Sequence, residues 1–343
     1  MTSPTNETRK RPATIIDVAR LAGVAIGTVS RHLNGQSVRA GNRDQIEQAI
    51  AALGYRRNST AVAMKTNTSR IVGFLVPSLG EFHAAMLEQL SRQMRLSGRA
   101  VLSFCHNLQP ASIREALEFF ATHRVDALVM DGDETARQEL LRHVDDGLVV
   151  VLYDNDIPDL PADRVFVDNR KASARAVSHL LDLGHRRISV IHGSQRDSAG
   201  RERLQGYHDA FAAHGLVPDP SLIMDGQWLE ARGYDCMRNL LSLAEPPTAA
   251  FIANYNMTLG ALAYLHEAGI EIPRDLSLVS FDDVPALRLH NPAITAVGQP
   301  IAEIAQAIAG IVDARLANPA AMGRQNMRID CGITLRDSTR PLK

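Results

Sequence analysis

Apolar, strand-sized runs alternate with amphipathic helical stretches from Ile71 onward, and this alternation constrains the fold more than any other feature of the sequence. The runs are rich in Val, Ile and Leu, which is typical of parallel strands covered by helices on both faces, and right-handed crossovers are then the default. The expected strands are IVGFLV (71–76), VLSF (101–104), ALVM (127–130), VVVLY (149–153), VFV (165–167), ISVIH (188–192), LIM (222–224), AAFIA (249–253) and LSLVSF (276–281). The expected helices are 83–97, 111–123, 134–145, 170–183, 201–214, 230–243 and 256–268.

This alternation is too long for a single doubly wound sheet, and the segment DNDIPDLPAD after Tyr153 interrupts it. Two α/β lobes with a ligand cleft between them are therefore the simplest architecture. The longest apolar runs are strand-sized and far shorter than a membrane span. The polar, basic N-terminus MTSPTNETRKRP lacks the apolar core of a secretory signal, so we expect a cytoplasmic protein without membrane partners.

A small helical unit is expected before this body. In TIIDVARLAGVAIGTVSRHLN (14–34), Thr14 and Asp17 form a helix-start pattern, Ala22-Gly23 suits a tight corner, and Asn34-Gly35 ends a second helix at about 26–33. A third helix is expected from near Asn42, with Gln45 in the capping-box position, to Gly54. The sequence therefore predicts a helix–turn–helix unit.

The charges are distributed unevenly along the chain. Residues 1–65 carry ten Lys or Arg and four Asp or Glu, a net charge of +6, whereas the remainder carries 27 basic and 34 acidic residues. A basic helical unit on an acidic body indicates a head that binds a polyanion, although a solvated charged face is the plainer alternative.

Ordered motifs run along nearly the whole chain. The head carries D-V-A-x-x-A-G-V-x-x-x-T-V-S-R-x-L-N-G (17–35) and G-Y-x-x-N-x-x-A (54–61). The body carries V-D-N (167–169), H-L-L-D-L-G-H-R-R-I (179–188), R-x-R-L-x-G-Y (201–207), G-A-L-A-Y-L (260–265), S-F-D-D (280–283) and T-L-R-D-S-T (334–339). This set of motifs resembles the lac-repressor/gal-repressor family of bacterial transcription regulators. The resemblance implies a homodimer that reads a pseudo-palindromic operator in double-stranded DNA.

The resemblance implies a domain order and a fold class. The fold is an all-α helix–turn–helix head, a hinge, and a two-lobed α/β body of the periplasmic-binding-protein type with two parallel sheets. We expect a disordered N-terminus at 1–13, the DNA-binding domain at 14–57, the hinge at 58–69, and the effector-binding and dimerisation core at 70–343. The first lobe is expected at about 70–164 and 294–325, and the second at about 165–290 and 326–343.

The resemblance also carries DNA-binding roles onto matching positions. Ile26 and Gly27 match the main base-reading positions, Arg31 is a further contact, and Met64 stands where the family usually has a Leu that wedges between base pairs. The other expected contacts, in the head and in the hinge helix, are Thr14, Thr28, Ser30, Asn34, Asn58 and Ala61. The sequence departs from the family at Ala25, where a Ser or Thr would cap the second helix. Because Ile26 and Gly27 have no side-chain donor, base reading there is expected to be apolar or shape-based.

A small polar effector, most simply a carbohydrate, is expected between the lobes. Arg201 matches the effector arginine and Asp282 a cleft aspartate, a pair that suits a sugar diol, while Trp228 matches a stacking aromatic. The further candidates are Phe82, Asp154, Asp197, Asn254 and Gln299. Plainer alternatives stay open: a surface ion pair of Arg201 with Glu202 or Asp209, a core position for Trp228, and a turn-capping role for Asp282.

Other function classes are less well supported. The sequence lacks G-x-G-x-x-G, G-K-[ST], G-x-S-x-G and H-E-x-x-H, so we expect no enzyme, no catalytic residue and no cofactor. Cys105, Cys236 and Cys331 lie far apart without a C-x-x-C pair, so neither a disulfide framework nor a cysteine-rich zinc site is expected, and no residue is assigned as a metal ligand. Two alternatives remain: a two-lobed sugar-binding protein without a DNA role, and a DNA-binding protein whose body only dimerises.

Overall fold

The structure, a computed structural model, describes residues 11, 13–56, 68–318 and 323–342. The chain divides into two compact units, 1–69 and 70–343, which are described separately below. The predicted disordered N-terminus lies almost wholly outside the described residues, as does most of the predicted hinge.

Three helices form the first unit: α1 (Ile15–Leu21), α2 (Ile26–Leu33) and α3 (Ala40–Leu53). The predicted start of α1 is confirmed, because the Thr14 and Asp17 side chains complete a capping box. The core contains Val18, Ala19, Ala22, Val29, Ile46 and Ala49. Helix α3 ends at Gly54, as predicted, with φ of +58°.

The start of α3 differs from the prediction. Its N-cap is Arg39, without a side-chain cap, and Asn42 lies inside the first turn. Asn42 therefore cannot be the cap, because the helix already begins at Ala40 and the Asn42 backbone N–H donates to the Arg39 carbonyl within it.

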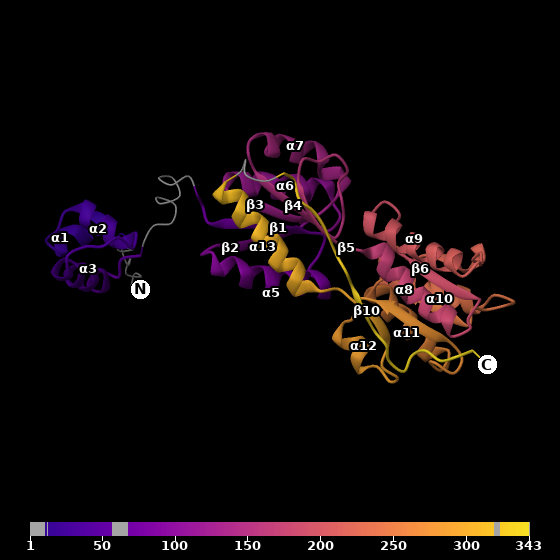
Figure 1. Ribbon diagram of the computed structural model, residues 1–343. Coiled ribbons are helices and arrows are strands. Elements are labelled where there is room, and N and C mark those ends of the chain that lie inside the picture. Colours follow the sequence, from indigo (N-terminus) through magenta and orange to yellow (C-terminus); the bar gives the residue numbers. More distant parts are fainter. Residues whose placement is uncertain (1–10, 12, 57–67, 319–322, 343) are drawn as a thin grey trace, which may run out of the picture. The chain divides into compact units, whose positions relative to one another are not determined.

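The second unit contains two sheets, each with six strands among the described residues (Figure 1). The first sheet has the order β11-β5-β4-β3-β1-β2, and every pairing in it is parallel. Its strands are β1 (Ile71–Val76), β2 (Ala100–Cys105), β3 (Ala127–Asp131), β4 (Val149–Tyr153), β5 (Asp163–Val167) and β11 (Asn326–Ile329). The predicted parallel α/β fold is thereby confirmed for this lobe.

The second sheet has the order β12-β10-β9-β8-β6-β7 and is parallel except for β12, which pairs antiparallel with β10. Its strands are β6 (Ile188–His192), β7 (Ile223–Asp225), β8 (Ala249–Ile252), β9 (Ser277–Phe281), β10 (Thr295–Gly298) and β12 (Gly332–Thr334).

Helices cover both faces of each sheet (Figure 1). In the first lobe, α5 (Glu81–Leu96) packs against α13 (Ile301–Ala317), while α6 (Pro110–Thr122), the 3-10 turn η1 (Glu134–Ala136) and α7 (Arg137–Asp145) form a separate apolar layer. In the second lobe, α8 (Asn169–Asp182) packs against α9 (Ser198–Ala213), and α10 (Glu230–Leu241) against α11 (Tyr255–Glu267). The remaining short elements are η2 (Pro220–Leu222) and α12 (Pro285–Leu289). No helix in the described part of the chain is long and apolar enough to cross a membrane.

Two returning segments lie in other lobes than the sequence prediction placed them. Residues 295–298 form β10 in the second sheet, and residues 326–329 form β11 in the first. Pairing explains both positions, because β10 adds parallel to β9 and β11 adds parallel to β5. The chain therefore crosses between the lobes three times, near residues 168, 299 and 330.

Candidate functional site

The face of α2 that was predicted to read bases is open. Ile26 is 48% exposed, Gly27 and Arg31 are also exposed, and a Cβ added at Gly27 would have open space around it. The Arg31 Nε donates to the Gly27 carbonyl over 3.3 Å. The N-cap of α2, Ala25, makes no side-chain cap hydrogen bond. This face can therefore approach a nucleic acid through small and apolar groups and one guanidinium.

The other predicted DNA contacts fall into two groups. Thr28 and Ser30 are half-buried on α2, and Asn34 is exposed at its C-cap. Thr14 is held by its hydrogen bonds to Asp17. Asn58, Ala61 and Met64 lie outside the described residues.

A cavity of about 270 Å³ lies between the two lobes of the body. Its polar groups follow the carboxyl ends of parallel strands from both sheets, where ligands bind in open α/β folds. Seven of the eight predicted effector residues line it: Phe82, Asp154, Asp197, Trp228, Asn254, Asp282 and Gln299. The cavity therefore joins residues that lie far apart in the sequence.

Trp228 forms part of the cavity wall in the second lobe. Its indole Nε1 donates to the Asp197 carboxylate over 2.6 Å. The backbone at Gly193 approaches the indole so closely that a Cβ there would lie 2.1 Å from the ring. Glycine is thus required at that position to let the ring lie against the strand end. The indole is fixed by a hydrogen bond and by this close backbone approach, and it also lines the cavity.

Asp282 is held at the end of β9 by two neighbours. Its Oδ1 accepts from Gln299 Nε2 over 2.7 Å, and its Oδ2 lies 3.4 Å from the Tyr255 backbone N–H. Asp282 has φ of +74°, a left-handed conformation that is sparsely populated outside glycine and that is often found at functional sites. Asn254 caps α11 by accepting from Met257 N, so its amide nitrogen stays available to the cavity.

The structure places Arg201 outside the cavity, contrary to the expectation for the effector arginine. Arg201 is exposed, and its guanidinium donates to the carbonyls of Gln195 and Arg196. Arg203, two residues further along α9, is 3% exposed and lines the cavity. Two residues correspond to about 200° around a helix, so the two arginines point to opposite sides.

The Arg203 guanidinium is fixed from several directions. It donates to Asn169 Oδ1 over 2.8 Å and to the Ala253 carbonyl over 2.6 Å, and it lies 4.0 Å from Asp154 Oδ1. Its Cζ is 3.7 Å from the centre of the Phe281 ring. The cavity thus has one well-oriented guanidinium.

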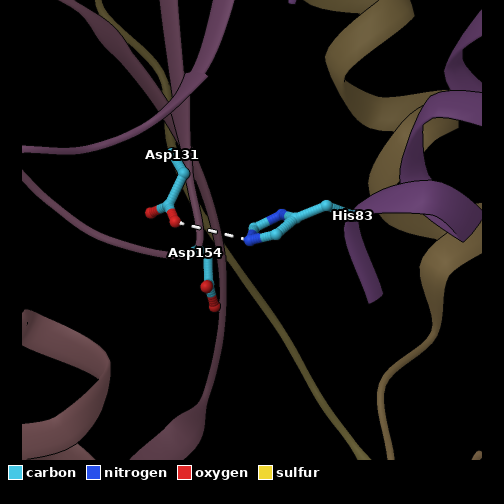
Figure 2. A group of neighbouring side chains, drawn as sticks. All are labelled: His83, Asp131 and Asp154. Carbon is cyan, nitrogen blue, oxygen red and sulfur yellow. Dashed lines mark ion pairs between the residues drawn. The ribbon is translucent and has the colours of Figure 1, made fainter. Parts of the chain in front are cut away.

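The first-lobe wall contains His83, Asp131 and Asp154, and one possible ligand atom from each lies within 4.8 Å of those of the other two. In Figure 2 the imidazole points toward the Asp131 carboxylate. Burial raises the pKa of Asp131 well above its usual range, and the negative charge of Asp154 raises it further. Burial also raises the pKa of Asp154 to about 6, which Arg203 partly offsets. For His83, burial lowers the pKa to about 4, so the imidazole is neutral at pH 7.

Sequence reasoning missed several lining groups besides Arg203. Three of them, His83, His106 and Asp131, lie directly after or at the ends of first-lobe elements. Asp131 ends a continuous apolar strand, a position at which a polar side chain can be recognised from the pattern alone. His106 directly follows β2, so the same strand-end pattern could have found it. His83 lies inside α5 and has no comparable signal, because single histidines on helices are more often structural.

Hydrogen bonds also join the two lobes around the cavity. The Tyr255 hydroxyl of α11 accepts from the Glu81 backbone N–H over 2.9 Å, and Asn155 Oδ1 accepts from the Ala199 backbone N–H over 3.0 Å. These two hydrogen bonds at the rim of the cavity therefore help to fix the position of one lobe relative to the other.

The fold and site together define a class: a helix–turn–helix head on a two-lobed body with a small-molecule cavity. Residues 14–58 match the family model described as bacterial regulatory proteins, lacI family, and residues 177–339 match a periplasmic binding protein-like domain. The HTH-type transcriptional repressor CytR of Escherichia coli (strain K12) is 30% identical over 333 residues, 96% of this chain and 97% of the relative. The chain belongs to the lacI family of bacterial regulatory proteins, which confirms the resemblance found in the sequence.

Solved structures agree in fold. The lac repressor dimer bound to operator and the anti-inducer ONPF has a TM-score of 0.85 and 24% identity, covering 96% of this chain and all of that chain. The complex of the transcriptional regulator CelR with cellobiose has a TM-score of 0.72 and 28% identity over the same shares.

Proposed function

We propose that this protein is a sequence-specific, homodimeric transcriptional repressor whose operator affinity is changed by a small polar effector, a sugar or sugar derivative, bound between the lobes. It acts in the cytoplasm by binding and not by catalysis. The observation that carries the proposal is the occurrence, in one chain, of an open recognition face on α2 and a cavity lined by polar groups from both sheets.

The head supports the DNA part of the proposal. The capped α1, the corner at Gly23 and the exposed α2 face have the geometry of a helix that enters a major groove. The basic excess of residues 1–65 would supply phosphate contacts. A pseudo-palindromic operator then requires two heads, and the lac repressor similar in fold is a dimer on its operator.

The cavity supports the effector part. Arg203 can donate to a hydroxyl oxygen, Asp282 can accept from a neighbouring hydroxyl, and Trp228 offers an aromatic surface. These groups suit a diol on a flat, partly apolar ring. In the similar CelR complex the ligand is cellobiose, which is itself a carbohydrate.

Coupling between the sites follows from the cross-lobe contacts. An effector that binds both walls changes the balance among contacts such as Tyr255 to Glu81, and hence the angle between the lobes. By thermodynamic linkage, operator must then change effector affinity by the factor by which effector changes operator affinity. Equal effector affinity with and without operator would contradict the coupling.

The first experiment selects genomic fragments that the purified protein retains at moderate salt and sequences them. We expect one or a few short inverted repeats, whose neighbouring genes nominate effectors for titration against Trp228 fluorescence. The selection is repeated with a metabolite extract. Failure to enrich any repeat in either condition would exclude a sequence-specific regulator and leave a sugar-binding role. Light scattering tests the assembly, and a monomer on the selected repeat would contradict the dimer.

A further inference from the structure

Three possible metal ligands converge on the first-lobe wall of the cavity. His83 comes from the first turn of α5, Asp131 from the end of β3, and Asp154 from the residue after β4. One ligand atom from each lies within 4.8 Å of the corresponding atoms of the other two. Figure 2 shows the imidazole pointing toward the Asp131 carboxylate, with Asp154 next to this pair. Side-chain shifts of about 1 Å would bring three such atoms to the roughly 2.0–2.2 Å from a common centre that a first-row ion requires.

Neighbouring groups orient two of these ligands. His83 Nδ1 lies 2.8 Å from the Tyr153 hydroxyl, which leaves Nε2 facing Asp131 Oδ2 at 3.7 Å. Asp131 Oδ1 accepts from Asn155 Nδ2 over 3.0 Å, so its other oxygen is the one directed at the imidazole. A hydrogen bond to the far atom of a ligand is the usual arrangement around protein-bound metal ions.

The atoms of this cluster are only loosely paired with one another and with their neighbours. The Nε2 to Oδ2 separation of 3.7 Å is too long for a hydrogen bond. Asp154 Oδ1 is buried without a hydrogen-bond partner among the described residues, and its nearest cation, the Arg203 guanidinium, is 4.0 Å away. Asp154 also has φ of +59°, a left-handed conformation that holds its side chain at this place.

A second imidazole, that of His106, lines the same cavity. His106 is 1% exposed, and neither of its ring nitrogens has a hydrogen-bond partner in the described part of the chain. Buried polar groups are nearly always paired, so a bare, buried imidazole in a cavity wall indicates a ligand that is not part of the protein.

The charge around the cavity is also unbalanced. Its lining contains five carboxyl groups and one guanidinium. A divalent cation at this wall would offset the negative charge of the two buried carboxylates next to His83.

We propose that His83 Nε2 and one carboxylate oxygen each from Asp131 and Asp154 bind a first-row divalent metal ion, Mn²⁺ or Zn²⁺. A mixed set of one imidazole and two carboxylates suits these ions better than Mg²⁺ or Ca²⁺, which prefer oxygen ligands alone. The remaining coordination positions face the cavity, where hydroxyl oxygens of the effector complete the shell. This last part rests on the proposed function, whereas binding of the ion by the three side chains does not.

The test is calorimetric titration of the full, untagged, chelator-treated protein with MnCl₂ and ZnCl₂, without DNA. We expect one ion per chain and a loss of at least tenfold in affinity for His83→Gln and Asp131→Asn. His123→Gln is the matched control, because His123 is exposed on the same lobe and lies outside the cavity. Asp131→Asn removes one buried carboxyl group, so the metal-free variant is expected to have a melting temperature no lower than that of the metal-free parent. An unchanged melting temperature would show that the loss of metal binding is not a loss of folding.

Two outcomes would overturn the proposal: no ion bound by the parent at micromolar concentration, or unchanged affinity and stoichiometry in both folded variants. Saturable binding of ammonium or an alkylamine together with no metal binding would also overturn it, and would assign the wall to an amino group. Operator selection on the same metal-free protein distinguishes the two proposals. If the protein binds the operator but no metal ion, only the proposed metal site is contradicted. If it binds the metal ion but enriches no operator, only the proposed role as a transcriptional regulator is contradicted.

Discussion

The Arg203 guanidinium lies 3.7 Å from the centre of the Phe281 ring, and its Nη1 donates to the Ala253 carbonyl over 2.6 Å. Phe281 ends β9, so the stacking ties α9 to the strand that Asp282 directly follows. Arginine stacks flat on an aromatic ring while its edge donates hydrogen bonds, and lysine cannot do both. This pairing makes Arg203 the fixed cation of the cavity.

Arg203→Lys should therefore weaken effector binding at least tenfold and lower the free energy of unfolding by about 1–3 kcal/mol, because Asn169 Oδ1 or the Ala253 carbonyl loses its buried donor. Arg201→Lys is the matched control: Arg201 is exposed, so both quantities should stay within about 0.5 kcal/mol of the parent. Trp228 fluorescence and urea unfolding measure the two quantities. Equal effects of the two substitutions would contradict the assignment of Arg203.

The arginine pair shows where sequence reasoning ended. The R-x-R frame assigned the effector role to Arg201, and that assignment was wrong, because Arg203 is the arginine of α9 that lines the cavity. Which one does so depends on the rotation of α9 against β6 and β9, a packing property that local sequence does not specify. The same limit applies to β10 and β11, whose lobes are decided by pairing with distant strands.

Ala25→Ser is expected to stabilise α2. The N-cap of this helix has no side-chain acceptor, while a serine hydroxyl there can accept from the backbone N–H of Gly27 or Thr28. The gain should be about 1 kcal/mol, measured as slower amide hydrogen exchange of α2 in the full chain. The parent, with alanine at the N-cap, is the reference, because alanine is among the poorest N-cap residues. Equal exchange rates in the serine variant and the parent would show that capping does not limit α2.

His185 gives the protein a stability that depends on pH. The ring is buried between Thr248, Ser277 and the Arg340 carbonyl, and burial lowers its pKa below 6.5. The unfolded chain therefore binds a proton more readily than the folded chain as the pH falls through 6.5, and stability is lost on acidification below that value.

The slope due to this one group is at most about 1.4 kcal/mol per pH unit. His185→Gln should remove it, so that the difference in unfolding free energy between parent and variant shrinks from pH 7.5 to pH 5. His266→Gln, at an exposed site on α11, should leave the difference constant. Urea unfolding at several pH values is the measurement, and parallel curves for the parent and His185→Gln would refute the prediction.

Those residues of the candidate site that directly follow a strand could be predicted from the sequence. Asp154, Asn254 and Asp282 stand directly after apolar runs, and parallel topology gathers such positions at one edge of each sheet. His83 and Tyr153 could not be linked from sequence, because their hydrogen bond depends on how α5 packs against the first sheet. The head was more predictable, since Thr14 and Asp17 interact within a single helical turn.

Arg31 offers the sharpest test of how the head reads DNA. The guanidinium is exposed on α2 and, if it binds a guanine bidentately, Arg31→Ala should cost about 1–3 kcal/mol on the selected operator and relax specificity at one base pair per half-site. Arg20→Ala is the matched control, because Arg20 is exposed on α1, where it pairs with Asp17. If Arg20 contacts a phosphate, its loss in Arg20→Ala would weaken binding equally on all sequences and reduce the salt dependence, without changing base preference. Binding of both variants to the operator and to its single-base variants, each at several salt concentrations, separates these roles. Uniform weakening by Arg31→Ala across all sequences would reassign Arg31 to the phosphate backbone and leave specificity to the apolar surface of Ile26 and to DNA shape.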